Sequence, residues 1–76
     1  MEIEDLKNNL SILGISEKEY SLDGSVNPDS IILYHNYSKW EVFYLDERGI
    51  KNSEKIFDSE SEACLYIYKR FIDSKK

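Results

Sequence analysis

The chain has one cysteine, one histidine and three glycines among its 76 residues, and each shortage argues against a class of site. A single thiol, Cys64, excludes an internal disulfide and a cysteine-based metal cluster, so packing must stabilise the fold. Three isolated glycines cannot build a phosphate-cradling loop. The scattered carboxylates also lack the spacing of a zinc site or a calcium loop. We therefore expect no metal and no cofactor.

Long apolar runs are missing as well. No stretch of about 18 apolar residues is present to span a bilayer, and the N-terminal MEIEDLKNNL has acids where a signal peptide needs bases. We expect a cytoplasmic protein with no membrane partner. A balance of 41% hydrophobic and 33% charged residues in so short a chain predicts one small folded domain over residues 1–76.

Negative charge is concentrated in the first half of the chain. Residues 1–38 hold seven acids and two bases, whereas residues 39–76 hold eight of each, so the whole net charge of −5 belongs to the first half. Such a field repels nucleic acid and anionic membranes and favours a basic partner. A modest net charge also keeps a small domain soluble. Both interpretations stay open at this point.

Hydrophobic spacing predicts a helix near each end of the chain. Ile3, Leu6, Leu10 and Leu13 recur at helical intervals and predict an amphipathic helix over about residues 2–13. The segment SESE at residues 59–62 matches a capping box, so a second, largely apolar helix should cover about residues 60–73.

Between the helices, runs of β-branched and aromatic residues predict strands over residues 31–37, 40–45 and about 50–57. These form an antiparallel meander, and only Tyr20–Leu22 indicates a further short strand in the connection before it. The expected fold is α+β with the order α-β-β-β-α, its meander packed by the N- and C-terminal helices.

The pairing of the first two strands decides which side chains form the core. A loop of two or four residues places Leu33 opposite Val42 and His35 opposite Trp40 on the better core face. A three-residue loop places His35 opposite Glu41 and reverses both faces. Both registers are compatible with the sequence, and the first predicts that Leu33, Val42 and Trp40 are buried.

No catalytic set emerges from the reactive residues. A Cys–His dyad needs Cys64 and His35 in hydrogen-bond contact, whereas a cysteine between Ala63 and Leu65 in an apolar helix is typical of a small buried hydrophobe. Adjacent acids such as Asp46 and Glu47 in a turn are usually solvated. We therefore expect a protein that is not an enzyme and has no catalytic residues.

Six tyrosines exceed the needs of so small a core. Tyrosine packs an apolar ring and keeps a polar end in water, so it suits both the rim of an undersized core and a protein interface. Because these tyrosines lie next to acids and lack flanking basic clusters, an interface with protein is favoured over one with RNA.

Three segments carry a family resemblance: WEVFY at residues 40–44, ERG at 47–49 and FDSESEAC at 57–64, which opens the last helix. Over about residues 20–72, the chain resembles small bacterial immunity proteins of polymorphic or contact-dependent toxin systems. The resemblance implies a monomer that forms a heterodimer with the C-terminal effector domain of a cognate toxin, a nuclease or an NAD-consuming enzyme. It implies inhibition by occlusion of the effector's active site, and no catalysis.

The partner surface is predicted from charge and exposure, because the resemblance supplies no contact residues. It should be acidic and studded with aromatic rings, and it should meet a basic effector. Its predicted members are Glu17, Glu19, Asp23, Tyr34, Glu41, Tyr44, Asp46 and Glu47. The alternative function is a small phage- or plasmid-derived regulatory protein that also acts by protein–protein binding.

Overall fold

The fold begins with a short amphipathic helix, α1 (Ile3–Ile12), close to the predicted range. The computed structural model describes residues 1–74 of the chain. Leu6 and Leu10 are buried on one side of α1, as the spacing predicts. Gly14 follows the helix with a positive φ of 79°, a conformation that glycine adopts without a Cβ clash.

A four-stranded sheet follows, with the strand order β1-β2-β3-β4. The predicted meander is confirmed: β2, β3 and β4 pair in antiparallel fashion. The predicted short strand is also present and pairs with β2 in parallel, which makes the sheet mixed. A 3-10 turn, η1, leads into it. The elements are η1 (Glu17–Glu19), β1 (Tyr20–Ser21), β2 (Ser30–Asn36), β3 (Lys39–Leu45) and β4 (Lys51–Phe57).

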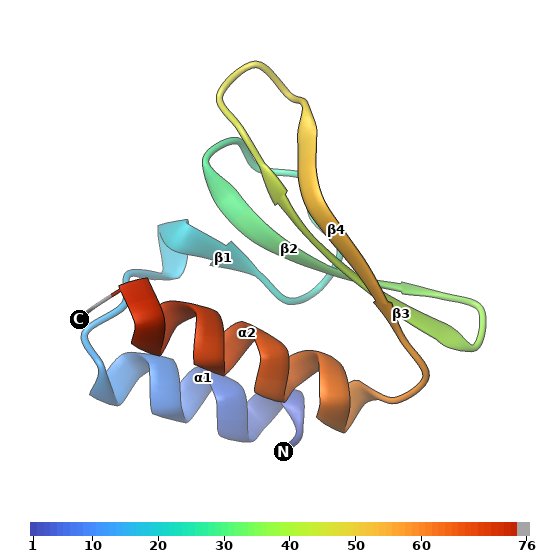
Figure 1. The fold of residues 1–76 in the computed structure, drawn as a ribbon. Coiled ribbons are helices and arrows are strands. Elements are labelled where there is room, and N and C mark those ends of the chain that lie inside the picture. Colours follow the sequence, from blue (N-terminus) through green and yellow to red (C-terminus); the bar gives the residue numbers. More distant parts are fainter. Residues whose placement is uncertain (75–76) are drawn as a thin grey trace.

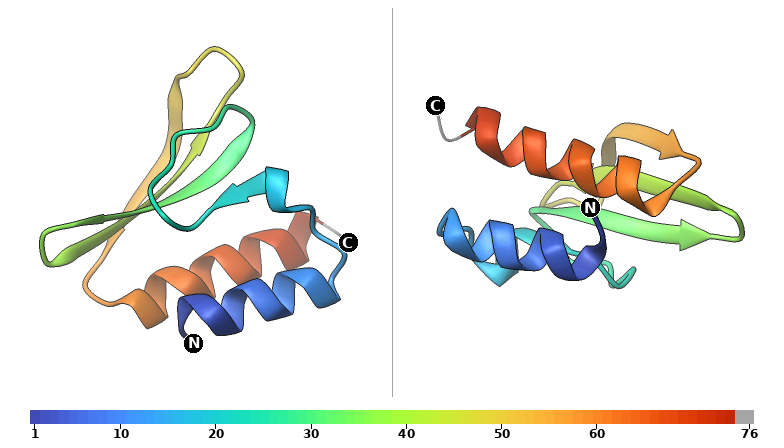
Figure 2. Two further views of the ribbon diagram at one scale, coloured as in Figure 1. Left: turned by 180° about the vertical axis from the view of Figure 1, so that it is seen from behind. Right: turned by 90° about the horizontal axis from the view of Figure 1, so that it is seen from below.

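The second helix, α2 (Glu60–Ser74), closes the described chain. Its start is capped by Ser59, whose Oγ accepts from the Glu62 N–H at 3.2 Å. Figures 1 and 2 show α1 and α2 side by side, running in the same direction under one face of the sheet. Their first turns are tied together, because the Met1 ammonium donates to Ser61 Oγ at 2.9 Å. Among residues 1–74, no helix is long and apolar enough to cross a membrane.

The β2–β3 register is the one that a two-residue loop gives. Leu33 faces Val42 and His35 faces Trp40, with Tyr37 and Ser38 at the turn. The alternative pairing of His35 with Glu41 is therefore wrong. Because alternate residues point to opposite faces, this register sends Leu33 and Val42 toward the helices and Tyr34 and Glu41 away from them.

The main core lies between the helices and the inner face of the sheet. Leu33 and Val42 are buried, as predicted, against Ile67 and Phe71 of α2 and the apolar side of α1. Trp40 is half-buried rather than buried, because it lies near the β2–β3 turn at the edge of this core. Its ring stacks on His35, with centroids 3.9 Å apart and planes at 2°.

A second, smaller cluster is buried on the outer face of the sheet, where the sequence predicted no core. It consists of Ile32, Phe43 and Leu45. The Lys51 side chain lies over the Phe43 ring, 4.7 Å from its centroid. A bulge between β3 and β4 opposite Phe43 breaks the regular register there, and bulges increase local twist. The rest of the outer face stays open.

Truncation of the inner core should be costly. Leu33→Ala should lower the free energy of unfolding by about 2 to 5 kcal/mol, the range for a buried leucine. Trp40→Ala should cost less than Leu33→Ala because Trp40 is half-buried. Denaturant unfolding of both variants would measure this, and a larger loss for Trp40→Ala would contradict the observed burial.

Candidate functional site

The structure divides the eight predicted partner-binding residues among several places instead of gathering them on one surface. Tyr34 and Glu41 lie opposite each other on the outer side of the sheet, and Asp23 belongs to the turn after β1 whose Gly24 lies beside the Tyr34 ring. The others lie in two hollows near β1 or at the β3–β4 turn, and they are Glu17, Glu19, Tyr44, Asp46 and Glu47.

Tyr34 is the centre of the outer group. It is 44% exposed, faces Glu41 across the β2–β3 ladder and lies against the turn after β1. The Gly24 backbone is so close that a Cβ there would lie 3.3 Å from Cδ2 of the Tyr34 ring. Glu41 is half-buried, and its Oε2 accepts from Asn36 Nδ2 at 3.0 Å. The ring and the carboxylate are therefore held side by side.

Asp23 precedes Gly24 in the turn beside the Tyr34 ring and carries a second negative charge. Its Oδ1 accepts from the Ser25 N–H at 3.0 Å and from Ser21 Oγ at 3.1 Å. These bonds, with the Ser25 bonds first, lower the pKa of the Asp23 carboxyl, so it is ionised at neutral pH. We call Asp23, Tyr34 and Glu41 the acidic-aromatic face. Its three members come from separate segments that meet only through the strand pairing.

The acidic-aromatic face continues onto the neighbouring edge strand. Ile56 of β4 pairs with Glu41 and is 62% exposed, so an apolar side chain follows the acid on the same side of the sheet. Lys39 also projects from this side, but its amine pairs with Asp58. A mixed apolar and acidic surface results.

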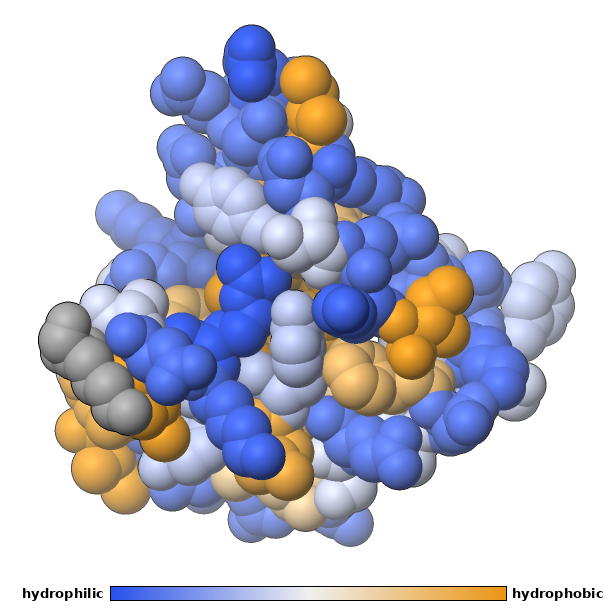
Figure 3. Space-filling view, in the orientation of Figure 1, coloured by the Kyte–Doolittle hydropathy of each residue, from blue (hydrophilic) through white to orange (hydrophobic). Residues whose placement is uncertain are grey.

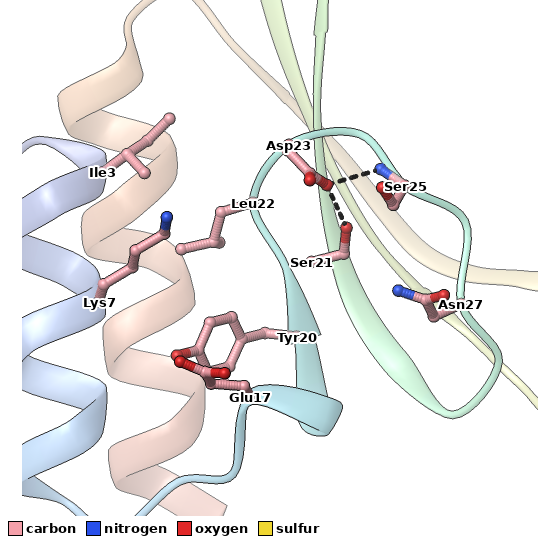
Figure 4. Close-up of a pocket in the computed structure, with 9 residues that line it drawn as sticks. All are labelled: Ile3, Lys7, Glu17, Tyr20, Ser21, Leu22, Asp23, Ser25 and Asn27. Carbon is pink, nitrogen blue, oxygen red and sulfur yellow. Dashed lines mark hydrogen bonds between the residues drawn. The ribbon is translucent and has the colours of Figure 1, made fainter.

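Glu17 lines a hollow of about 460 Å³ between α1 and β1, with Asp23 on its far wall. Figure 4 shows the Lys7 side chain of α1 reaching into the same hollow as Tyr20 and Leu22. Burial and the Glu17 charge both raise the pKa of Tyr20. Lys7 therefore brings a positive charge to a hollow that two carboxylates, Glu17 and Asp23, also line.

Glu19 and Tyr44 line a second hollow of about 270 Å³ beside the end of α2. Tyr44 is on the inner side of the sheet, opposite to Tyr34, and its hydroxyl donates to Asp29 Oδ1 at 3.2 Å. Glu19 caps the preceding turn by accepting from the Ser16 N–H at 3.0 Å. Arg70 also lines this hollow, and its buried Nη1 has no hydrogen-bond partner among residues 1–74.

Asp46 organises the β3–β4 turn, which projects away from both helices in Figure 1. Its Oδ1 accepts from the N–H groups of Arg48 and Ile50, each at 2.9 Å. These bonds, with the Ile50 bond first, lower the pKa of the Asp46 carboxyl. Glu47 is exposed at the tip of the same turn. The acceptor capacity of Asp46 is thus largely used inside the protein.

An apolar hollow of about 280 Å³ lies between β4 and α2 and contains none of the predicted residues. Figure 3 shows hydrophobic atoms on this side of the molecule, surrounded by hydrophilic ones. The rings of Phe57 and Tyr66 line it with centroids 5.2 Å apart, and exposed Leu65 completes the wall.

Tyr37 is a prominent exposed residue that the predicted partner surface did not include. It is 94% exposed at the β2–β3 turn and has a positive φ of 58°. The sequence signal was the two-residue loop itself, because the first of two loop residues often needs a positive φ. The predicted strand over residues 31–37 included Tyr37 and so concealed it.

The reactive residues are apart from one another. Cys64 is buried in the core, and burial first, then the Glu60 charge, raises the pKa of its thiol to about 11. His35 lies near the hairpin end, stacked on Trp40. Within residues 1–74, no group of three or more His, Cys, Asp and Glu residues is placed to hold a metal ion.

Comparisons with known proteins identify no relative of this chain. No family model matches the chain, and neither a curated protein nor a solved structure matches it. A function for this protein must therefore be inferred from its residues and their geometry.

Removal of the Asp46 carboxylate should destabilise the turn and flatten the acid dependence of stability. In the folded protein the pKa of Asp46 lies below its ordinary value of 3.8. The stabilisation that the Asp46 carboxylate provides is therefore complete above pH 3.8 and is lost as the pH falls through the lowered pKa. Thermal unfolding from neutral pH to about pH 2 would compare wild type with Asp46→Ala. The stability of Asp46→Asn, which keeps one acceptor oxygen, should lie between those of wild type and Asp46→Ala. Identical curves for all three proteins would contradict this role.

Cys64 should react slowly while the protein is folded. A buried thiol with a pKa of about 11 has little thiolate at neutral pH, and the thiolate is the reactive form. A chromogenic disulfide reagent should label the native protein far more slowly than the denatured protein. Cys64→Ala should lower the melting temperature through a small cavity and leave partner binding intact. Rapid native labelling would show that this part of the core opens.

Proposed function

We propose that this protein is an immunity protein that binds the C-terminal effector domain of a cognate bacterial toxin and occludes its active site. The effector is a nuclease or an NAD-consuming enzyme, and the complex is a heterodimer that forms in the cytoplasm. The observation that carries the proposal is the acidic-aromatic face, where Tyr34 faces Glu41 on the open side of the sheet beside the turn that carries Asp23.

The chemistry of this face suits such an effector. An enzyme that binds nucleic acid or a phosphorylated cofactor presents cationic groups to phosphate. Fixed carboxylates on an inhibitor compete for the same groups and steer its approach. Tyr34, with its ring half in solvent and supported by Gly24, supplies apolar area that a partner can bury.

The proposal needs no chemistry from the inhibitor. Stoichiometric occlusion requires a stable folded surface, and the hydrogen bonds from Asn36, Ser21 and Ser25 hold the two acids in place before binding. Preorganised side chains lose less conformational entropy when they bind.

The test is co-expression with the C-terminal domain of a candidate toxin, sought as a large secreted protein encoded by a neighbouring gene. Wild-type protein should rescue growth and form a one-to-one complex with an inactive variant of that domain. Glu41→Lys should slow association several-fold at low salt, and the difference should shrink as salt is added. Tyr34→Ala should mainly speed dissociation, because buried anchors govern the dissociation rate.

Glu47→Lys is the matched control. It changes the net charge by the same amount but lies at the exposed tip of the β3–β4 turn, away from the acidic-aromatic face. Equal slowing by Glu41→Lys and Glu47→Lys would show that overall charge matters and this face does not. Failure of the wild-type protein to bind or protect would contradict the proposed function, and binding to another cellular protein without protection would favour a regulator.

A further inference from the structure

Tyr37 occupies a position that its side chain does not favour. It is the first residue of the two-residue β2–β3 turn, with a φ of 58°, and Ser38 after it has no positive φ. Glycine is the usual residue at such a position because a Cβ crowds the backbone there. Asn and Asp can offset this crowding with a local hydrogen bond, whereas the phenol of Tyr37 is too distant from its own backbone to do so.

The Tyr37 ring is not part of the packed core. Tyr37 is 94% exposed and belongs to neither buried cluster. A large apolar ring is thus held in solvent, in a strained backbone conformation, where glycine would serve the turn better. A strained backbone conformation that does not help to stabilise the fold is typical of a binding site.

The turn that carries Tyr37 is braced on both sides. On the outer side Asn36 Nδ2 donates to Glu41, and on the inner side His35 stacks on Trp40 with centroids 3.9 Å apart. The ion pair between Lys39 and Asp58 ties the returning strand to the residue after β4. These contacts restrain the residues on either side of the turn, which lowers the entropy lost when a partner immobilises it.

We infer that Tyr37 is an anchor residue whose ring inserts into an apolar pocket of the effector domain. This inference rests on the proposed function and extends its surface, because Tyr37 lies just beyond the end of β2, next to Asn36, whose amide donates to Glu41. The partner pocket has apolar walls for the ring and a polar rim for the phenol. Tyrosine anchors of this kind carry much of the binding energy in protein interfaces.

A protein pocket fits this site better than a nucleic acid base. A stacking platform for single strands needs free cations beside the rings. Here Glu41 is the neighbouring charge, and the one lysine at the turn, Lys39, is already paired with Asp58. The net charge of −5 adds to the repulsion of phosphates.

The test uses three substitutions that separate the ring from the strain. Tyr37→Ala removes the ring and keeps a Cβ, so affinity for the inactive effector domain should fall by about 30-fold, the change that corresponds to a hot-spot residue, while melting stays near wild type. Tyr37→Gly should lose the same affinity and melt at a higher temperature, because the strain is gone. Tyr37→Phe keeps the ring and should retain most of the affinity. Ile50→Ala, at an exposed apolar position on the other hairpin turn, is the control and should bind like wild type.

Each possible result either supports or overturns the role of Tyr37 as an anchor. Loss of affinity in Tyr37→Ala and Tyr37→Gly, with stability unchanged in the first and raised in the second, supports it. Wild-type affinity in Tyr37→Ala overturns it and leaves the proposed function standing. Tyr37→Gly melting below wild type overturns the claim of strain. Binding of a fluorescent oligouridine that Tyr37→Ala abolishes would overturn the assignment to a protein pocket. A wild-type protein that does not bind the effector domain overturns both proposals.

Discussion

The β2–β3 register is the constraint on which the rest of this structure depends. A turn of two residues, Tyr37 and Ser38, sets Leu33 opposite Val42 on the side that the helices cover. The same turn sets Tyr34 opposite Glu41 on the side that stays open. A slip of one residue would expose the core and bury a carboxylate, and burial of an unpaired charge is far more costly than the loss of any single contact. Core and candidate binding face are thus two consequences of one pairing.

Many of the acidic side chains stabilise helix ends or turns, so negative charge alone does not identify a binding surface. Parallel packing brings the first turns of α1 and α2 together, so two positive helix ends adjoin. Acids in both first turns, Glu4 and Asp5 in α1 and Glu60 and Glu62 in α2, offset them. Asp46 and Glu19 are committed to turns. Asp23 and Glu41 are also hydrogen-bonded, but Glu41 faces the half-exposed Tyr34 and Asp23 belongs to the turn beside that ring. That combination distinguishes the acidic-aromatic face.

The fold could be predicted from the sequence because its signals are local. Helical spacing in α1, the Ser59 cap of α2 and the β-rich runs each follow from neighbouring residues. The candidate site depends on what strand pairing brings together, and that could not be predicted. The turn that carries Asp23 lies beside Tyr34 because β1 joins β2 in parallel, and Tyr44 points to the inner side because side chains alternate along the strand. Trp40 is half-buried because the helices do not extend over the end of the β2–β3 hairpin. Tyr37 was predicted as a strand residue because amino-acid composition does not reveal a positive φ.

The most direct test of the central claim, that the open side of the sheet binds the partner, is a chemical-shift titration. The ¹⁵N-labelled protein would be titrated with an inactive variant of the proposed effector domain. We predict that the perturbed amides are those of residues 23–25, 34–37 and 41, with the amides of α1 and the β3–β4 turn unchanged. Perturbations confined to α1 and the outward side of α2 would place the partner on the helices and contradict this claim.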